Sequence, residues 1–105
     1  MLTSGESAEA VANRLKLTRE ALGYKPSTIA RLMGVSQQAW TNWERGRMIT
    51  LPAALKLCAV TRVHLDWIYR GIRAGLPRDL SERMAQLEVE HSQRESRSKR
   101  TPTRE

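Results

Sequence analysis

Glycine residues interrupt residues 8–71 at short intervals, and these interruptions constrain the fold more than any other feature of the chain. Between them the apolar residues recur every three or four positions, which is the period of an α-helix. No convincing alternation of apolar and polar residues indicates a strand. The sequence therefore predicts an all-α fold with a compact five-helix domain over residues 1–71. Glycines are expected at or near the ends of four helices, at Gly23, Gly34, Gly46 and Gly71.

Other residues mark where several of these helices begin. Ser36 and Thr50 are good N-caps, and Pro26 and Pro52 suit a first helical turn. The spacing also predicts an inward apolar face for each helix. In chain order these faces contain Ala8, Val11, Leu15, Thr18 and Leu22; Ile29, Leu32 and Met33; Ala39, Trp40 and Trp43; Leu51, Leu55 and Cys58; and Leu65, Trp67 and Ile68.

The C-terminal third of the chain differs in composition from the five-helix domain. A capping-box pattern followed by a narrow apolar stripe predicts a sixth helix in a C-terminal extension over residues 72–90. The pattern consists of Asp79 and Glu82, and the stripe of Leu80, Met84 and Leu87. Residues 91–105 contain no Val, Ile, Leu, Met or aromatic residue. Because they cannot bury enough surface to offset the entropy of ordering, we expect a disordered basic tail there.

The chain carries a net charge of +7 and has a pI of about 10.5. This balance favours a polyanionic partner, and nucleic acid is the commonest one for a soluble protein. The single cysteine, Cys58, cannot form an intrachain disulfide, and no apolar run approaches the ~20 residues that span a bilayer. These features predict a cytoplasmic protein, associated with the nucleoid if bacterial.

Catalysis and metal binding have little support in the sequence. Cys58, His64 and His91 do not provide the roughly four ligands of a zinc site, and Cys58 is more simply a small core residue. No nucleophile accompanies a suitable histidine and acid, and there is no glycine-rich phosphate loop. We therefore expect no enzyme, no metal site and no cofactor.

The link Gly34-Val35-Ser36 joins the second and third predicted helices. A short link containing glycine, between two short helices, is typical of a helix-turn-helix. The outward face of the third helix is polar and carries Gln37, Gln38, Thr41, Asn42 and Arg45. Gln and Asn can pair bidentately with adenine, Arg can pair with guanine, and a Thr methyl can contact thymine. From the residues alone this face favours DNA reading, and a solvated amide-rich surface is the alternative.

The stretch from about Ala12 to Gly71 resembles the Xre/Cro-cI family of bacterial and phage helix-turn-helix regulators. Short motifs occur in the family's order and at close to its spacing, and the ending resembles a short single-domain proteobacterial branch. The motifs are Arg14-Leu15-Lys16 with Arg19-Glu20, Gly23, Ile29-Ala30, Gly34-Val35-Ser36, Trp43-Glu44-Arg45-Gly46, Leu55-Lys56-Leu57-Cys58 and Leu65-Asp66-Trp67-Ile68-Tyr69-Arg70-Gly71. The resemblance implies a lambda-repressor-like DNA-binding domain with its helix-turn-helix at about residues 26–45.

The resemblance also implies a role for each residue that matches the family pattern. The residues placed to read bases are Gln37, Gln38 and Asn42, with Thr41 beside them. The residues placed to contact the DNA backbone are Lys25, Ser27, Arg31, Ser36, Arg45 and Arg47. Arg19 and Glu44 match a buried salt bridge that links the first and third helices.

The chain departs from the family pattern at a few positions. Pro26 stands where the family usually has a glutamine that contacts phosphate, which leaves Lys25 for that contact. Met48 and Ile49 replace the usual polar residues of the loop before residue 51. Their side chains either pack against the domain or line a dimer contact. His64 stands where many relatives have a serine or threonine cap.

The family resemblance implies a regulator of transcription, a repressor by default, that binds operator DNA as a homodimer. Helix five and residues 72–87 are the expected dimer surface. Two alternatives use the same fold. One is the antitoxin of a toxin–antitoxin pair, whose C-terminal extension would bind a protein. The other is a protein-interaction module that has lost DNA binding.

Overall fold

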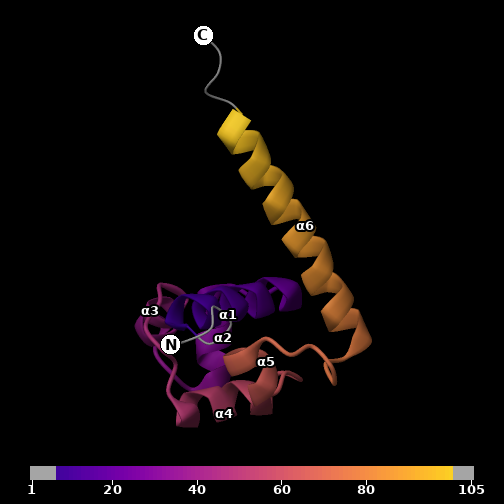
Figure 1. Ribbon diagram of the computed structural model, residues 1–105. Helices are drawn as coiled ribbons and strands as arrows, with labels where there is room; N and C mark the ends of the chain where they lie inside the picture. The colour runs from indigo at the N-terminus through magenta and orange to yellow at the C-terminus, as the bar shows by residue number, and fades with distance from the viewer. Residues whose placement is uncertain (1–6, 101–105) are drawn as a thin grey trace.

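The computed structural model of the chain describes residues 7–100, and all of its regular elements in this range are α-helices. They are α1 (Ala8–Leu22), α2 (Pro26–Met33), α3 (Gln37–Glu44), α4 (Leu51–Val60), α5 (Leu65–Arg70) and α6 (Arg78–Arg100). Helices α1 to α5 form one cluster, whereas α6 projects away from it (Figure 1). The all-α class and the five-helix domain that the sequence predicted are confirmed.

Caps at both ends keep the helices of the cluster short. The Ser36 hydroxyl accepts a hydrogen bond from the Ala39 N–H at 3.0 Å, and the Thr50 hydroxyl accepts one from the Ala53 N–H at 3.3 Å. After α1, Gly23 adopts a φ of 79°, a left-handed conformation that a residue without a Cβ reaches most easily. These caps satisfy backbone groups that a helix end leaves unpaired, and α1, α2 and α5 end at the predicted glycines Gly23, Gly34 and Gly71.

Tryptophans make up much of the volume of the core. Trp40 and Trp67 are almost fully buried, and Trp43 packs edge-on against Trp40 with ring centroids 6.1 Å apart. The Trp67 indole N–H donates to the Thr18 hydroxyl at 2.8 Å, and that hydroxyl donates to the Arg14 carbonyl at 2.7 Å. Thr18 is therefore buried without leaving a polar atom unpaired, which connects α1 to α5 inside the core.

The predicted inward face of α4 is wrong. Ala53, Ala54 and Leu57 are buried, whereas Leu51 and Leu55 are about half exposed. The spacing could not show this because every residue of α4 except Lys56 is apolar or cysteine, so both faces look alike in the sequence. The small alanines let α4 pack closely on its neighbours α2 and α5. Leu32 of α2, also expected to face inward, is exposed, and Cys58 is only partly buried.

Helix α6 packs on α1 through the apolar stripe that the sequence indicated. Leu80, Met84 and Leu87 are buried there. The predicted capping box is wrong, because α6 begins at Arg78 and Asp79 lies inside its first turn. The Asp79 carboxylate instead lies 3.6 Å from the guanidinium of Arg62.

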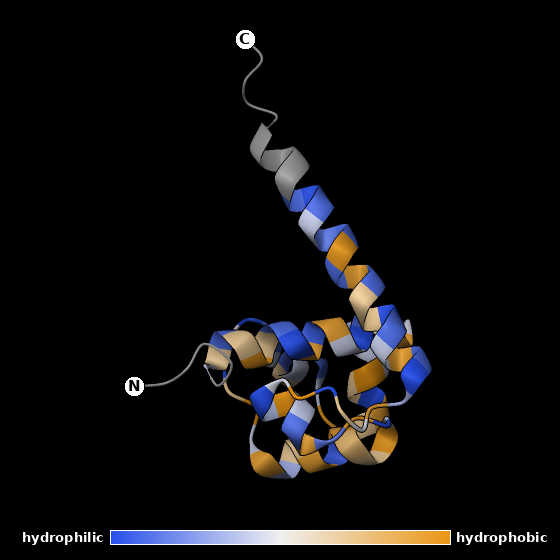
Figure 2. Cartoon of the chain, turned by 45° about the vertical axis from the view of Figure 1, so that its right-hand side comes forward, coloured by the Kyte–Doolittle hydropathy of each residue, from blue (hydrophilic) through white to orange (hydrophobic). Residues whose placement is uncertain are grey.

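Helix α6 also runs to Arg100, past residue 90, where the disordered tail was expected to begin. Neither glycine nor proline interrupts residues 78–100, and arginine, glutamate, glutamine and lysine are good helix formers. The His91 imidazole lies 3.3 Å from the Glu20 carboxylate of α1, which attaches one further turn to the domain. The apolar residues of α6 lie in the turns nearer the domain, and the coloured turns that follow them are hydrophilic (Figure 2). Residues 101–105 of the expected tail lie outside the described residues.

The part of the chain that the structure describes contains no helix with the length and apolar character needed to cross a membrane.

Candidate nucleic-acid interface

Helices α2 and α3 are joined by the short link that the sequence singled out. Gly34 has a φ of 76° and ends α2, and the Val35 N–H bonds back to the Ala30 carbonyl at 3.0 Å. Ser36 then caps α3. Trp40 and Trp43 bury the inner side of α3 in the core. The link and the two tryptophans together set the position of α3 on the surface of the domain.

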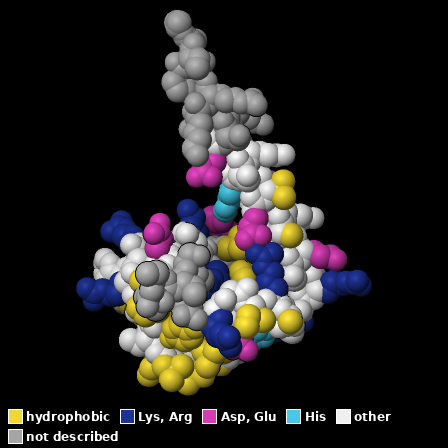
Figure 3. All heavy atoms as spheres, in the orientation of Figure 1, with side chains coloured by type: hydrophobic (Ala, Val, Ile, Leu, Met, Phe, Trp, Pro, Cys, Tyr) yellow, Lys and Arg dark blue, Asp and Glu magenta, His cyan; other side chains and the backbone are white. Residues whose placement is uncertain are grey.

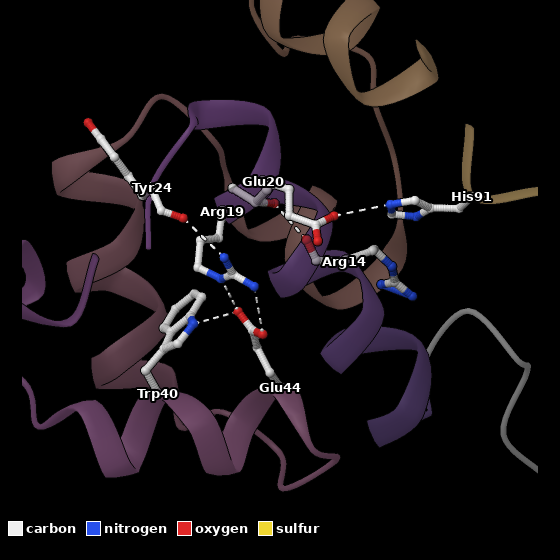
Figure 4. Close-up of polar contacts among 8 residues, drawn as sticks. Arg14, Arg19, Glu20, Tyr24, Trp40, Glu44 and His91 are labelled. Atoms are coloured by element: carbon white, nitrogen blue, oxygen red, sulfur yellow. Dashed lines mark hydrogen bonds and ion pairs between the residues drawn. The ribbon is translucent and has the colours of Figure 1, made fainter. Parts of the chain in front are cut away.

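An ion pair connects α3 to α1 and further limits how α3 can turn. Arg19 Nε lies 2.6 Å from one Glu44 oxygen, and Arg19 Nη2 donates to the other at 3.2 Å. The Trp40 indole N–H also donates to Glu44, and Arg19 donates to the Tyr24 carbonyl at 3.0 Å (Figure 4). Both charged side chains are only 13% exposed. The pair anticipated from the sequence is present and is bidentate, the strongest geometry for arginine and a carboxylate.

The polar side of α3 faces away from these contacts. Gln37 and Gln38 are exposed, and Thr41 and Asn42 are partly exposed. The helical period places Gln38, Thr41 and Asn42 on the side opposite the buried tryptophans, and Gln37 at the edge of that side. The Gln38 side-chain N–H donates to the Asn42 side-chain oxygen at 3.1 Å. The sequence analysis missed this bond, although the i, i+4 spacing of two amides was a signal for it.

Exposed cations lie on α2 and at the C-terminal end of α3. Lys25, Arg31, Arg45 and Arg47 are all exposed, as are the hydroxyl-bearing residues Ser27 and Ser36. Lys25 is the N-cap residue of α2 but makes no side-chain capping bond. Arg45 follows the last turn of α3, and the Arg47 N–H bonds to the Asn42 carbonyl at 3.0 Å, which folds the loop against α3.

Four cations of this region form no ion pair, although Glu9 of α1 lines the same pocket as Arg45. Glu44 is the only acidic residue in the sequence from 21 to 65, and Arg19 already neutralises it. Within the described side chains, Lys25, Arg31, Arg45 and Arg47 take part in no ion pair. Several arginines elsewhere do have acidic neighbours: Arg62, Arg70, Arg73 and Arg78. The surface around α2 and α3 therefore carries an excess of exposed cations.

Two polar side chains outside this surface have structural roles. The His64 imidazole accepts a hydrogen bond from the Trp67 N–H at 3.2 Å and so caps α5. Its other nitrogen donates to the Ala74 carbonyl at 3.0 Å. Arg14 donates to the Ile68 carbonyl at 2.8 Å, and burial lowers the pKa of its guanidinium. The sequence analysis placed Arg14 in a family motif but did not find this contact.

The described residues show no cluster of three histidine, cysteine, aspartate or glutamate side chains arranged for a metal ion. Burial raises the pKa of the Cys58 thiol, which keeps it protonated near neutral pH.

Comparison with known proteins connects this geometry to a family. A family model described as Helix-turn-helix matches residues 15–68, just over half of the chain and most of the α1–α5 cluster. No significant match was found among curated proteins or solved structures.

Proposed function

The chain belongs to the Xre/Cro-cI type of helix-turn-helix regulators, which bind DNA, and from this premise we propose that it is a sequence-specific repressor of transcription. In this proposal α3 enters the major groove of an operator and the protein blocks access of polymerase. The proposal divides the chain into a DNA-binding domain over residues 1–71, an extension over 72–90 and a basic C-terminal end over 91–105.

The single observation that carries the proposal is the unbalanced charge around α3. Exposed amide side chains of α3 are flanked in the sequence and on α2 by cations that form no ion pair among the described side chains. A polyanion that supplies phosphates to the cations and base edges to the amides fits both parts of this surface.

The base-reading role falls to the outer face of α3. The major groove presents a distinct pattern of donors and acceptors for each base pair, and amides can match adenine bidentately. Gln37 and Gln38 are the most exposed candidates near the N-terminal end of α3, with Thr41 and Asn42 one turn further along. The Gln38–Asn42 hydrogen bond orients both amides before DNA arrives.

The backbone-contact role falls to the residues that flank α3. Lys25, Arg31, Arg45 and Arg47 are proposed to neutralise phosphates. Ser27 and Ser36 are proposed to accept or donate hydrogen bonds beside them. Such contacts position the protein and carry no sequence information by themselves.

Regulators of this kind often bind as twofold dimers on half-sites about 34–36 Å apart, so we propose a homodimer on the operator. A cytoplasmic, nucleoid-associated location follows from the same proposal.

Selection of bound sequences from random double-stranded DNA, carried out with the full chain at two salt concentrations, tests this function. We expect enrichment of a motif with twofold symmetry and an affinity that falls steeply as salt rises. A variant with both Gln37→Ala and Gln38→Ala serves as the matched control and should enrich a degenerate motif. Recovery of unselected sequence, or the same motif from wild type and control, would contradict the proposal.

A further inference from the structure

The side chains of Gln38 and Asn42 form a hydrogen-bonded pair on the outer face of α3. The Gln38 side-chain N–H donates to the Asn42 side-chain oxygen at 3.1 Å. The two residues lie one helical turn apart, so their amides meet without any change in the backbone. Among the described residues, neither amide bonds to another side chain, and the Gln37 amide makes no side-chain hydrogen bond at all. Two amides of α3 are therefore oriented by each other, and the third is not.

The backbone of Asn42 is also held in place. Its carbonyl accepts hydrogen bonds from the Arg45 N–H at 3.1 Å and from the Arg47 N–H at 3.0 Å, where the loop after α3 folds back. The next residue, Trp43, is buried in the core. The orientation of the Asn42 amide is therefore set by its bond to Gln38 rather than by movement of the helix.

The direction of this bond decides what Asn42 presents to a ligand. A carboxamide has one acceptor oxygen and two N–H donors. Because the Asn42 oxygen faces Gln38, its amino group faces away from the pair, and its N–H groups have no partner among the described residues. A glutamine and an aspartate at the same spacing form a bond of the same direction, since an ionised aspartate only accepts. Gln38 keeps its oxygen and one N–H, so it still presents both an acceptor and a donor.

The pair lies where the proposed function places the base edges of DNA. Gln38 is exposed and Asn42 is partly exposed. Lys and Arg side chains project at the left edge of the molecule in Figure 3, the side on which Figure 1 shows α3, whereas hydrophobic side chains gather over α4 at the lower edge. In a groove from which water is excluded, a donor that faces another donor is left unpaired, which is costly. The orientation of the Asn42 amide therefore has consequences for base selection.

We propose that the Gln38–Asn42 bond makes Asn42 select a keto base, guanine or thymine, over an amino base, adenine or cytosine, at one position of the operator. In the major groove guanine and thymine present the acceptors O6 and O4, whereas adenine and cytosine present amino groups at N6 and N4. The outward N–H groups of Asn42 pair with the first kind and oppose the second. This inference rests on the proposed function. It makes Gln38 a positioning residue for Asn42 in addition to a reader of its own base.

Reversal of the hydrogen bond tests the inference. In Gln38→Glu the new carboxylate only accepts, so an Asn42 N–H donates to it and the Asn42 oxygen turns outward. An acidic residue in the first turn of α3 is favourable for a helix, so the fold should be retained. Sequences selected from random double-stranded DNA by the full chain should then change from keto to amino bases at the position read by Asn42. We expect a preference of about fivefold or more in each direction. Asn42→Ala identifies this position as the one where the preference disappears.

Gln37→Glu is the matched control, because it adds the same charge on the neighbouring residue, and Thr41, one turn further along, carries no amide. It should weaken binding through repulsion of phosphates and keep the keto preference at the position read by Asn42. Gln38→Met removes the donor with little change in side-chain length, so Asn42 rotates freely and the position should tolerate all four bases. A keto preference that persists in Gln38→Glu and in Gln38→Met, or an amino preference in the wild type, would overturn the inference.

A measurement without DNA separates the hydrogen bond from DNA binding. In nuclear magnetic resonance spectra of the free, isotope-labelled chain, the side-chain amide signals of Asn42 should shift in Gln38→Glu and stay in place in Gln37→Glu. If selection yields no motif, the proposed function fails and this inference fails with it. If the wild type enriches a motif but the position read by Asn42 does not respond to Gln38→Glu, or if the Asn42 signals move equally in both variants, the inference fails and the function stands.

Discussion

Removal of Glu44 should be the most damaging single change to a polar residue of the domain. In the Glu44→Ala variant the Arg19 guanidinium loses both of its carboxylate contacts, at 2.6 and 3.2 Å, and the Trp40 indole N–H loses its acceptor. Both members of the ion pair are only 13% exposed, so water replaces these contacts poorly. Breaking a buried pair by deleting one partner typically costs about 3–5 kcal/mol.

The lower end of that range applies here. Arg19 keeps its hydrogen bond to the Tyr24 carbonyl, and its residual exposure allows some hydration. We therefore expect a loss of about 3 kcal/mol in the free energy of unfolding. At roughly 4–8 °C per kcal/mol for a domain of this size, Tm falls by about 12 °C or more. Thermal and urea unfolding followed by tryptophan fluorescence and circular dichroism measure both quantities.

A double-mutant cycle isolates the pair from other effects of the substitution. Replacing both partners, as Arg19→Met with Glu44→Leu, leaves no buried charge alone and should recover much of the stability lost in either single variant. Glu82→Ala is the control, because its ion pair with Arg78 is 3.6 Å long and mostly exposed, and it should change the stability by less than about 1 kcal/mol. Additive losses in the cycle, or a Glu44→Ala loss no larger than that of Glu82→Ala, would refute the reasoning.

Three further predictions concern the DNA surface and the C-terminal helix. Gln38→Ala should reduce discrimination at one or two base pairs by roughly 1–3 kcal/mol each, and binding to a panel of single-base operator variants measures this. An unchanged preference would contradict base reading by Gln38. Arg47→Ala should weaken binding to all sequences alike and reduce the salt slope by about 1, as fluorescence anisotropy at several salt concentrations would show. A loss confined to one sequence would argue against a phosphate contact. Among the side chains that the structure describes, deletion of residues 91–105 removes the 3.3 Å contact between His91 and Glu20 and no buried apolar side chain, so Tm should fall only slightly in a thermal scan. A drop as large as that expected for Met84→Ala, about 2–5 kcal/mol in stability, would show a larger role for this segment.

The helices and their ends were predictable because each depends on local chemistry. Ser36 and Thr50 cap helices through their own hydroxyls, and Gly23 and Gly34 adopt left-handed conformations that favour glycine. The length of α6 was less predictable. Composition alone argued for disorder beyond residue 90, but helix propensity needs no apolar residue and a preceding anchored helix supplies the nucleus.

The part of the candidate site that lies on α3 was predictable, because α3 has one polar face and one apolar face. In α3 the amides and the tryptophans alternate with the helical period, so the outer face can be identified from the sequence. Contacts between residues far apart in the sequence could not be predicted in this way. The bond from Arg14 to the Ile68 carbonyl depends on how α1 and α5 meet, which no local pattern encodes. The absence of acidic residues on the outer face of α3 was visible in the sequence, but the structure was needed to show that Glu44 is paired with Arg19.

The outer side of α4, which carries Leu51 and Leu55, shows where prediction from the contrast between two helix faces fails. A helix that is apolar on both sides offers no period to read, so the sequence assigned Leu51 and Leu55 to the core. The fold instead uses the alanine side, because close packing against α2 and α5 requires small side chains there. Leaving two leucines half exposed costs about 25 cal/mol for each Å² that stays in water, which a monomer gains nothing by retaining. The residues that defeat the sequence prediction are therefore the ones that leave apolar surface on the outside of the domain.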